Sequence, residues 1–529
     1  MTINKYISII AAAISLTAAS CTKDLDRTPY VQETSESVYK DPAKIKSVLA
    51  KLYGGLSLSG QDYENASLAD LYTTDAGSVV FLRTWWSLQE FTTEEAVIGW
   101  NDGDLLAYHN LNWTPDGKYL KIMYDRLFFG IASCNEFLRQ TTDDKMSSFT
   151  EAERNNIKNY RYEARFLRAL YYWVAMDMYG NIPFVTENDP VGLFQPPQKS
   201  RSEIFTYVET ELKELENLLP EPGTNEYGRV DKGAAWMLLA KIYLNSAIYT
   251  GTARYTETIT YCNKLIGAPV YRLSSSYANL FKTDNNLTGE IIFPIAADGV
   301  TSQSYGNTSF IILCALGGKM NPADYGMSTT WGGMRATKTM VNQFADPTGL
   351  TDKRAIFYTN GQSLEITSLS DFTNGYAVPK FVNKSSTGQA GKDPTGRFTD
   401  TDFPMFRLGD VYLMYAEAVV RGGSGGSLSN ALNYVNLLRQ RAYGNNSGNI
   451  ASGALTLDFL LAERGRELYW EGQRRTDLIR FGKFTDGSYV WPWKGGVAQG
   501  IGVNKRYNMF PIPTADLIAN PNLKQNSEY

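Results

Sequence analysis

Apolar side chains recur with the period of an α-helix in one stretch after another of this 529-residue chain. The first stretch begins at Asp41 and Pro42, since aspartate caps a helix and proline fits its first turn, and it stops at Gly54 and Gly55. Successive pairs of such stretches favour helix–turn–helix repeats stacked as a solenoid. The remaining helices are predicted at 119–138, 151–179, 201–219, 232–249, 255–266, 408–420, 428–443 and 457–470.

A long stretch of different composition interrupts the helical pattern. From 269 to 405, Gly, Asn, Ser and Thr are frequent, and short apolar runs at 291–295 and 310–313 predict short strands. We therefore expect a helical part over 41–268, an irregular, loop-rich insertion over 269–405, and a second helical part over 406–529. Because loops on a rigid scaffold often carry binding sites, the insertion is where we expect ligand contacts.

The N-terminus has the layout of a bacterial secretion signal. Lys5 precedes an apolar run over 7–19, and small residues lead directly to Cys21. A cysteine at that point predicts a lipoprotein, in which a signal peptide at 1–20 is removed and Cys21 is acylated at the start of an extended, lipidated tether over 21–40. A soluble secreted protein cleaved at the same place is the alternative. No later apolar run reaches the roughly 20 residues that a membrane-spanning helix needs.

Net charge and the scarcity of histidine and cysteine exclude several classes of function. The formal net charge of −4 provides no basic field for nucleic acid. His109 is the only histidine, which excludes zinc sites built on two or three histidines, and we expect it at the surface or half-buried. Cys134, Cys262 and Cys314 do not form the pattern of a disulfide framework, so we interpret them as buried, inert thiols.

Carboxylates occur in two groupings that could carry chemistry. Glu463, Glu467 and Glu471 recur every four residues on one predicted helix face, and a glycoside hydrolase needs two carboxyl groups about 5–10 Å apart. Because arginines surround them, an ion-paired structural network is the favoured interpretation, and a lipid-anchored glycoside hydrolase is the alternative. We expect no required cofactor. The sequence contains no EF-hand loop, but the oxygen ligands of Asp284, Asp400 and Asp402 could coordinate a structural Ca²⁺.

Aromatic residues are abundant, at 13% of the chain, with 34 Tyr and 10 Trp. Part of this excess belongs to the core, and the rest must lie at the surface or in clefts. Exposed rings suit ligands with flat apolar faces, such as sugar rings, and Tyr and Trp also offer a polar group to hydroxyls. The composition therefore indicates a carbohydrate ligand.

Several motifs resemble the SusD/RagB family, in the family's order and over most of the chain after the signal peptide. They are YEARFLRALYYW at 162–173, YGNIP at 179–183, GRVDKGAAW at 228–236, FRLGDVYLMYAEA at 406–418, ERGREL at 463–468, EGQRRTDLIRFG at 471–482, PIP at 511–513 and NPNLKQN at 520–526. The resemblance implies a mainly α fold, a tetratricopeptide-like helix-pair solenoid with a large loop-rich insertion containing short strands. It also implies a non-catalytic, glycan-binding outer-membrane lipoprotein of Bacteroidetes-type bacteria. Such proteins lie as a lid over a SusC-like TonB-dependent transporter, and the acidic run at 23–26 resembles their surface-export signal.

Within the family the likeness is strongest to a starch-binding member, on WPWKGG at 491–496 and NKRYN at 504–508. This resemblance implies a starch or malto-oligosaccharide ligand. The same architecture could take a fructan, a hemicellulose or a host glycan, and a purely structural adaptor would instead bury its tryptophans. An asparagine that the family carries three residues after its first tryptophan is replaced here by glycine, and two polar neighbours could substitute for it. The residues implied in glycan binding are Trp100, Tyr305 and Trp331 as an aromatic arc, with Arg83, Asn101 and Asp102 as hydrogen-bonding groups.

Overall fold

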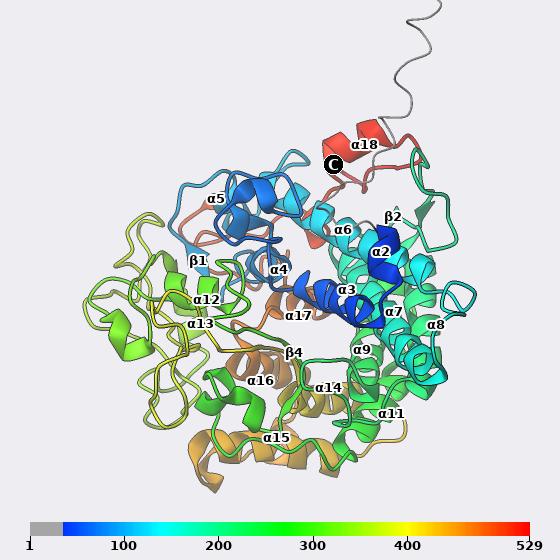
Figure 1. Cartoon of the computed structure of the whole chain (residues 1–529). Coiled ribbons are helices and arrows are strands. Elements are labelled where there is room, and N and C mark those ends of the chain that lie inside the picture. The colour runs from blue at the N-terminus through cyan, green and yellow to red at the C-terminus, as the bar shows by residue number, and fades with distance from the viewer. Residues whose placement is uncertain (1–34) are drawn as a thin grey trace, which may run out of the picture.

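The computed structural model describes residues 35–529, and these are mainly helical (Figure 1). Within them, no helix is both long and apolar enough to cross a membrane. The helices are α2 (Ser35–Tyr39), α3 (Pro42–Gly54), α4 (Phe81–Glu90), α5 (Leu105–His109), α6 (Lys118–Gln140), α7 (Glu151–Tyr179), α8 (Arg201–Leu218), α9 (Lys232–Leu244), α10 (Ser246–Thr250), α11 (Tyr255–Ile266), α12 (Thr308–Ala315), α13 (Lys338–Val341), α14 (Leu408–Val420), α15 (Leu428–Tyr443), α16 (Leu457–Leu468), α17 (Arg474–Arg480) and α18 (Thr514–Ala519).

Successive helices pack on one another and form a stack on one side of the molecule. Helix α6 packs on α7, α7 on α8, α8 on α9, α9 on α11, α11 on α14 and α14 on α15 (Figure 1). Local sequence sets the ends of the longest of them. Thr150 and Glu153 form a capping box at the start of α7, and Gly180, with a φ of 73°, ends it in a conformation that favours glycine. The stack confirms the expected mainly α, helix-pair fold.

Short strands occur in pairs, and two of these pairs involve the loop-rich insertion. Three antiparallel pairs occur in residues 35–529: β1 (Val97–Ile98) with β5 (Met334–Arg335), β2 (Ile182–Pro183) with β3 (Gln198–Lys199), and β4 (Ile291–Ile295) with β6 (Phe403–Arg407). The strand predicted at 291–295 is confirmed as β4. The one predicted at 310–313 is wrong, because this segment lies in α12, which Asn307 caps by accepting from the Ser309 amide. Every residue of α12 is buried, so its apolar run has no period that separates a helix from a strand.

Packing against distant residues changes the predicted structure at two further places. Residues 35–39 of the expected extended tether form α2 instead, and the Tyr39 ring packs 6.4 Å from that of Phe137 in α6. Residues 1–34, and with them the predicted lipidation site Cys21, lie outside the described residues. The helix predicted at 232–249 is divided at Asn245 into α9 and α10.

His109 is fully buried, so the expectation of a surface or half-buried histidine is wrong. Its Nδ1 lies 3.2 Å from the Phe91 carbonyl oxygen and its Nε2 lies 2.9 Å from that of Pro492. Burial lowers the pKa of His109 to about 4, so the ring is neutral and its single N–H donates to one of these two carbonyl oxygens. The three cysteines after Cys21 are free and buried, as predicted.

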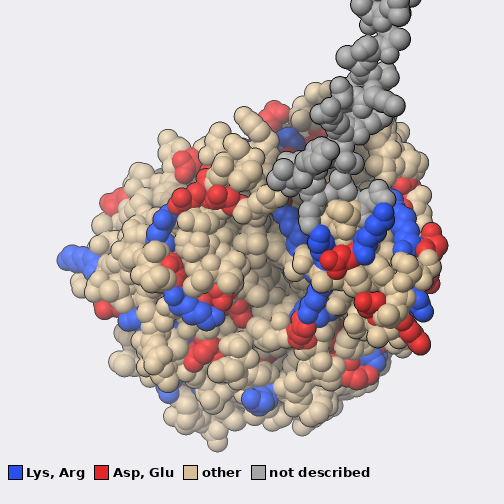
Figure 2. All heavy atoms as spheres, in the orientation of Figure 1, with Lys and Arg blue, Asp and Glu red and all other residues tan. Residues whose placement is uncertain are grey.

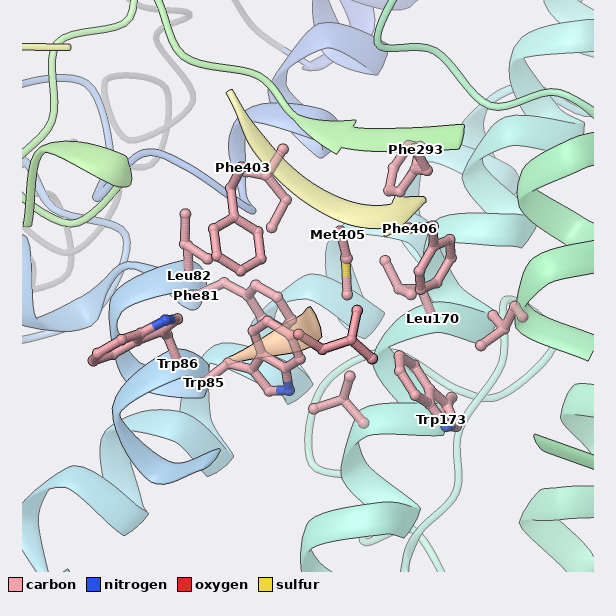
Figure 3. Packing of buried hydrophobic residues seen from close by; sticks show 14 of the residues in the cluster. Phe81, Leu82, Trp85, Trp86, Leu170, Trp173, Phe293, Phe403, Met405 and Phe406 are labelled. Carbon is pink, nitrogen blue, oxygen red and sulfur yellow. The ribbon is translucent and has the colours of Figure 1, made fainter. Parts of the chain in front are cut away.

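One face of the molecule is hollowed beside α3, and Figure 2 shows acidic and basic side chains interspersed around it. The core beneath is continuous from the helical stack to the β4–β6 pair (Figure 3). Trp85 of α4 lies 6.1 Å from Phe403, and Trp173 of α7 lies 6.2 Å from Phe406, measured between ring centroids. Burial of each such ring stabilises the fold by roughly 1.5–3 kcal/mol. The strand β6 is therefore held between α4 and α7.

Candidate binding site

The three aromatic residues predicted to form an arc lie next to one another. The ring centroids of Trp100 and Trp331 are 6.1 Å apart with 54° between the ring planes, and those of Tyr305 and Trp331 are 5.3 Å apart at 51°. All three rings are half-buried. Neighbouring rings are therefore tilted relative to one another and form a contiguous, partly exposed apolar surface that is not flat.

The backbone around β1 and α12 places these rings. Trp100 follows β1, and the Gly99 amide donates to the Gly333 carbonyl oxygen at 2.9 Å beyond the β1–β5 pair. A side chain at Gly333, whose φ is 99°, would lie 2.5 Å from the Trp100 indole nitrogen, so close packing of that ring requires glycine there. The Trp331 amide donates to a carbonyl of α12 at 2.8 Å, which fixes the second tryptophan to the same helix that Tyr305 precedes.

Arg83 lies beneath the aromatic surface rather than at its rim. It is on α4, only 7% exposed, with its guanidinium carbon 4.5 Å from the centroid of Phe310. Its guanidinium lies 3.4 Å from a carboxylate oxygen of Asp75, and its amide donates to the Gly306 carbonyl oxygen at 3.0 Å. Arg83 therefore lies at the turn that carries Tyr305, and little of its side chain is open to solvent.

The polar residues that follow Trp100 are exposed, whereas Arg83 is buried. Asn101 and Asp102 are both exposed, in the turn between β1 and α5. Gly103 follows with a φ of 56°, a conformation that favours glycine and turns the chain into α5. Both side chains are therefore free to reach a ligand that lies on the Trp100 ring.

Sequence reasoning missed a second layer of residues around Tyr305. Arg397 donates to the Tyr305 hydroxyl and to Glu64, and its guanidinium lies over the Tyr305 ring at 5.4 Å. The rings of Tyr63 and Phe398 lie 5.9 Å and 4.9 Å from that of Tyr305. Because these residues come from two segments, 63–64 and 397–398, that are both distant in sequence from Tyr305, no local motif could have identified them.

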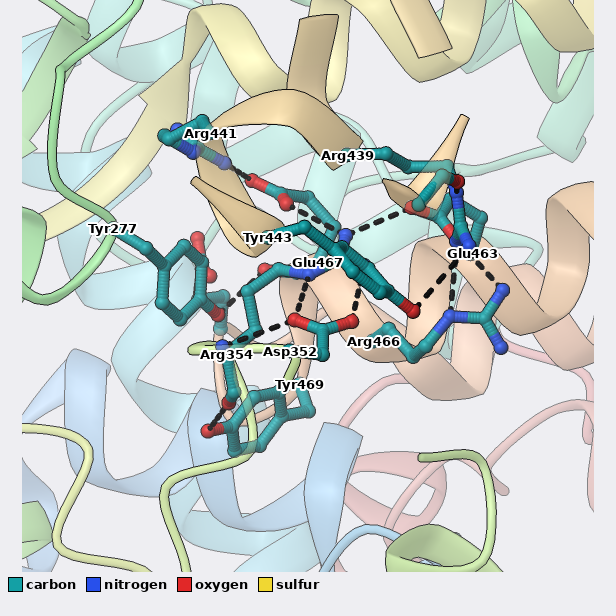
Figure 4. A network of polar contacts seen from close by, with 12 residues as sticks. Tyr277, Asp352, Arg354, Arg439, Arg441, Tyr443, Glu463, Arg466, Glu467 and Tyr469 are labelled. Atoms are coloured by element: carbon teal, nitrogen blue, oxygen red, sulfur yellow. Dashed lines mark hydrogen bonds and ion pairs between the residues drawn. The ribbon is translucent and has the colours of Figure 1, made fainter. Parts of the chain in front are cut away.

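The glutamates of α16 and the turn after it belong to a buried ion-pair network (Figure 4). Glu463 pairs with Arg354 at 2.8 Å, and Glu467 pairs with Arg354 at 3.1 Å and with Arg407 at 2.8 Å. Burial alone would raise the pKa of Glu467, but the surrounding arginines lower it to about 2. The network confirms the ion-paired interpretation, and it leaves neither glutamate placed as a proton donor to a substrate.

The aspartates considered as calcium ligands are each engaged with separate partners. Asp284 accepts from the Ser386 amide at 2.8 Å, Asp400 from the Gly299 amide at 2.9 Å, and Asp402 from the Ala297 amide at 2.9 Å. Among residues 35–529, no group of three or more His, Cys, Asp or Glu side chains is placed to hold a metal ion. The structure therefore does not assemble the three aspartates into a cation site.

Known proteins resemble the chain over its whole length. Residues 351–529 match the SusD family, and residues 24–244 match a family described as "Starch-binding associating with outer membrane". The starch-binding protein SusD of Bacteroides thetaiotaomicron is 33% identical, over 99% of this chain and 98% of the relative. A SusD superfamily protein of Parabacteroides distasonis superposes with a TM-score of 0.70 at 23% identity, over 94% of this chain and 100% of its own. Surface glycan-binding protein A of Bacteroides thetaiotaomicron, solved with laminarihexaose, has a TM-score of 0.69 at 20% identity, over 92% and 99%.

Proposed function

The chain belongs to the SusD family, and we propose that it binds starch and malto-oligosaccharides without hydrolysing them and delivers them to a SusC-like TonB-dependent transporter. The observation that carries this proposal is that the partly exposed rings of Trp100, Tyr305 and Trp331 lie next to one another. The full-length similarity to a starch-binding protein supports the choice of glycan.

We infer that the ring surface follows the curve of an α-1,4-glucan. Each α-1,4 linkage rotates the next ring in the same sense, so the chain curves, and a flat platform would contact it at few points. The tilts of 54° and 51° between neighbouring ring planes support this inference, because the three rings do not form a flat platform. Sugar rings stack through their C–H faces, and each stack stabilises the complex by on the order of 1 kcal/mol. Three stacks add about 3 kcal/mol to the free energy of burying the sugar faces, and the entropy of association offsets part of this sum, so we expect weak binding, which suits a protein that must release its ligand.

The hydroxyl groups of the glucan need polar partners at the edge of the rings. Asn101 and Asp102 are exposed and follow Trp100 directly, and we propose that they supply these partners. Arg83 would contribute through the small exposed part of its side chain, and its backbone amide supports the turn that carries Tyr305. Lipid attachment at Cys21 would hold this surface at the outer membrane, next to the transporter that receives the glycan.

Calorimetry of residues 22–529 with maltoheptaose tests the proposal. We expect weak binding that Trp331→Ala reduces at least about fivefold, the value of one lost stack. Trp236→Ala is the matched control, because Trp236 is also half-buried but lies on α9, where its indole nitrogen donates to Glu216 at 3.0 Å. Equal binding by both variants would remove Trp331 from the site. No binding by the wild type would refute starch as the ligand, and fructans, xylans and host glycans would then be compared.

A further inference from the structure

The hollow beside α3, on the face shown in Figure 2, is lined by residues other than those of the aromatic surface. It encloses about 330 Å³ between α3, the loop at 226–229 and the end of β4. Apolar side chains form its floor, and the polar groups lie at its edge. Its main lining residues are Leu49, Tyr53, Glu226, Tyr227, Pro294 and Ser302.

Tyr227 presents an exposed but fixed aromatic ring to this hollow. Its side chain is among the large apolar groups left open to solvent, at 52% exposure. Its hydroxyl nevertheless donates to Asp402 at 2.7 Å, and Asp402 is itself buried and accepts from the Ala297 amide at 2.9 Å. The following residue, Gly228, has a φ of 83°, so the loop makes a tight turn directly after the ring. The ring is therefore held in one place, as a stacking platform must be.

The polar edge of the hollow carries charges of both signs. Lys46 of α3 pairs with Glu226 at 2.8 Å, and these side chains are 49% and 60% exposed. Arg229 lies 3.2 Å from Glu226 and is otherwise committed to the buried Glu163. An ion pair that stays open to solvent offers both donors and acceptors without a net charge. This edge suits a neutral, hydroxyl-rich ligand with an apolar face, which is the chemistry of a hexose.

The hollow continues towards the aromatic surface of the first site. A neighbouring depression of about 320 Å³ is lined by 58–63 and 300–303 and shares Leu58 and Ser302 with the hollow beside α3. It includes Tyr63, whose ring lies 5.9 Å from that of Tyr305.

The chain segment 398–402 joins the two sites directly. Phe398 lies 4.9 Å from the Tyr305 ring, and Asp402 holds Tyr227. Phe398 and Asp402 are four positions apart, so their Cα atoms are at most about 14 Å apart. The two ring systems are therefore close enough for one oligosaccharide to span them.

We propose that the glucan-binding surface extends through the depression at 58–63 and the hollow beside α3 to Tyr227. Tyr227 then forms a second stacking subsite for the distal sugars of a long oligosaccharide. This inference rests on the proposed function of the first site. It gives the protein a preference for long glucans that the three clustered rings alone would not produce.

Binding of maltotriose and maltodecaose to wild type, Tyr227→Ala and Tyr227→Phe tests the inference. Maltotriose is too short to span both ring systems, so we expect Tyr227→Ala to leave its affinity unchanged. The same variant should weaken maltodecaose binding about fivefold, the value of one ring–sugar stack. Tyr227→Phe keeps the ring and should retain maltodecaose affinity to within about twofold. Unchanged maltotriose affinity also shows that the Tyr227→Ala protein is folded.

The outcomes separate the inference from the function on which it rests. If wild type binds both oligosaccharides and Tyr227→Ala binds maltodecaose as tightly as wild type, the second subsite is refuted and the first site stands. Equal loss for maltotriose and maltodecaose also refutes it, because the effect is then not on distal sugars. If wild type binds neither oligosaccharide, starch binding itself is refuted, and the proposed second subsite for starch is refuted with it.

Discussion

Replacement of Glu467 by glutamine separates a structural role of the buried glutamates from a catalytic one. Its carboxylate accepts from Arg354, Arg407 and Arg441 and is fully buried. In Glu467→Gln one oxygen becomes an amide nitrogen, which can only donate and would face an arginine donor. The charge that balances the arginines is also lost. Breaking a buried ion pair on one side costs about 3–5 kcal/mol.

That cost translates into a measurable melting temperature. Unfolding entropy is about 2.1 cal/mol/K per residue, or about 1 kcal/mol/K for a chain near this length, so 3–5 kcal/mol lowers Tm by about 3–5 °C. Glu365→Gln is the matched control, because Glu365 pairs with Lys338 at 2.8 Å on the surface, where side chains are 62% and 41% exposed. A surface pair contributes about 0–1 kcal/mol, which predicts a Tm change below about 1 °C.

The pH dependence of the difference has a defined sign. The folded-state pKa of Glu467 is about 2, below its ordinary value of 4.5. Its ionised form therefore stabilises the fold above pH 4.5, and this contribution declines as the pH falls towards 2. We expect the Tm difference between wild type and Glu467→Gln at pH 7 to shrink over that range. A Glu467→Gln protein with unchanged Tm, together with release of reducing sugar by wild type that the variant lacks, would refute the structural role and favour a hydrolase.

Two further predictions concern packing and protonation in the core. A side chain at Gly130 of α6 would lie 2.5 Å from the Tyr171 ring, so Gly130→Ala should lower Tm by about 1–3 °C. Gly453→Ala is the control, because no atom lies within 4 Å of its added carbon, and it should change Tm by less than about 0.5 °C. Equal effects of the two substitutions would contradict the packing argument. Burial raises the pKa of Glu90 to about 7 beside the buried Glu95, so wild type should lose stability as the pH rises from 4.5 to 7. Glu90→Gln should match the Tm of wild type near pH 5 and exceed it by about 1–3 °C at pH 8. A variant that melts below wild type at pH 8 would contradict this assignment.

The helical stack could be predicted because its information is local. The capping box at Thr150 and the glycine at 180 bound α7 within a few residues of chain, and apolar periodicity identifies the buried face between them. Helix α12 and His109 could not be predicted in the same way. Both are buried on all sides, and their environment comes from segments hundreds of residues away, such as the Pro492 carbonyl that contacts His109.

The candidate site shows the same division. Trp100, Tyr305 and Trp331 were found through motif resemblance, and the structure brings the three rings together. The contact of Arg397 with Tyr305 joins residues 92 positions apart, and its contact with Glu64 joins residues 333 positions apart. Neither contact leaves a spacing that a single sequence could reveal, so the support of the rings was predictable only once the fold was known.

The ring surface is anchored to the buried polar framework, and this affects how it can bind. The Glu94 carboxylate pairs with Arg474 of α17 at 2.6 Å, and the Glu94 carbonyl oxygen accepts from the Thr337 hydroxyl at 2.6 Å. Glu94 therefore connects α17 to the β1–β5 pair, which Trp100 follows. The Trp470 indole donates to the Glu95 carbonyl oxygen at 2.8 Å just before β1. Rings held from behind in this way need little ordering when a sugar arrives, so little of the stacking energy is lost to conformational entropy. For the proposed glucan ligand we therefore expect affinity to be limited by the small contact area of a few stacks, which is compatible with rapid release.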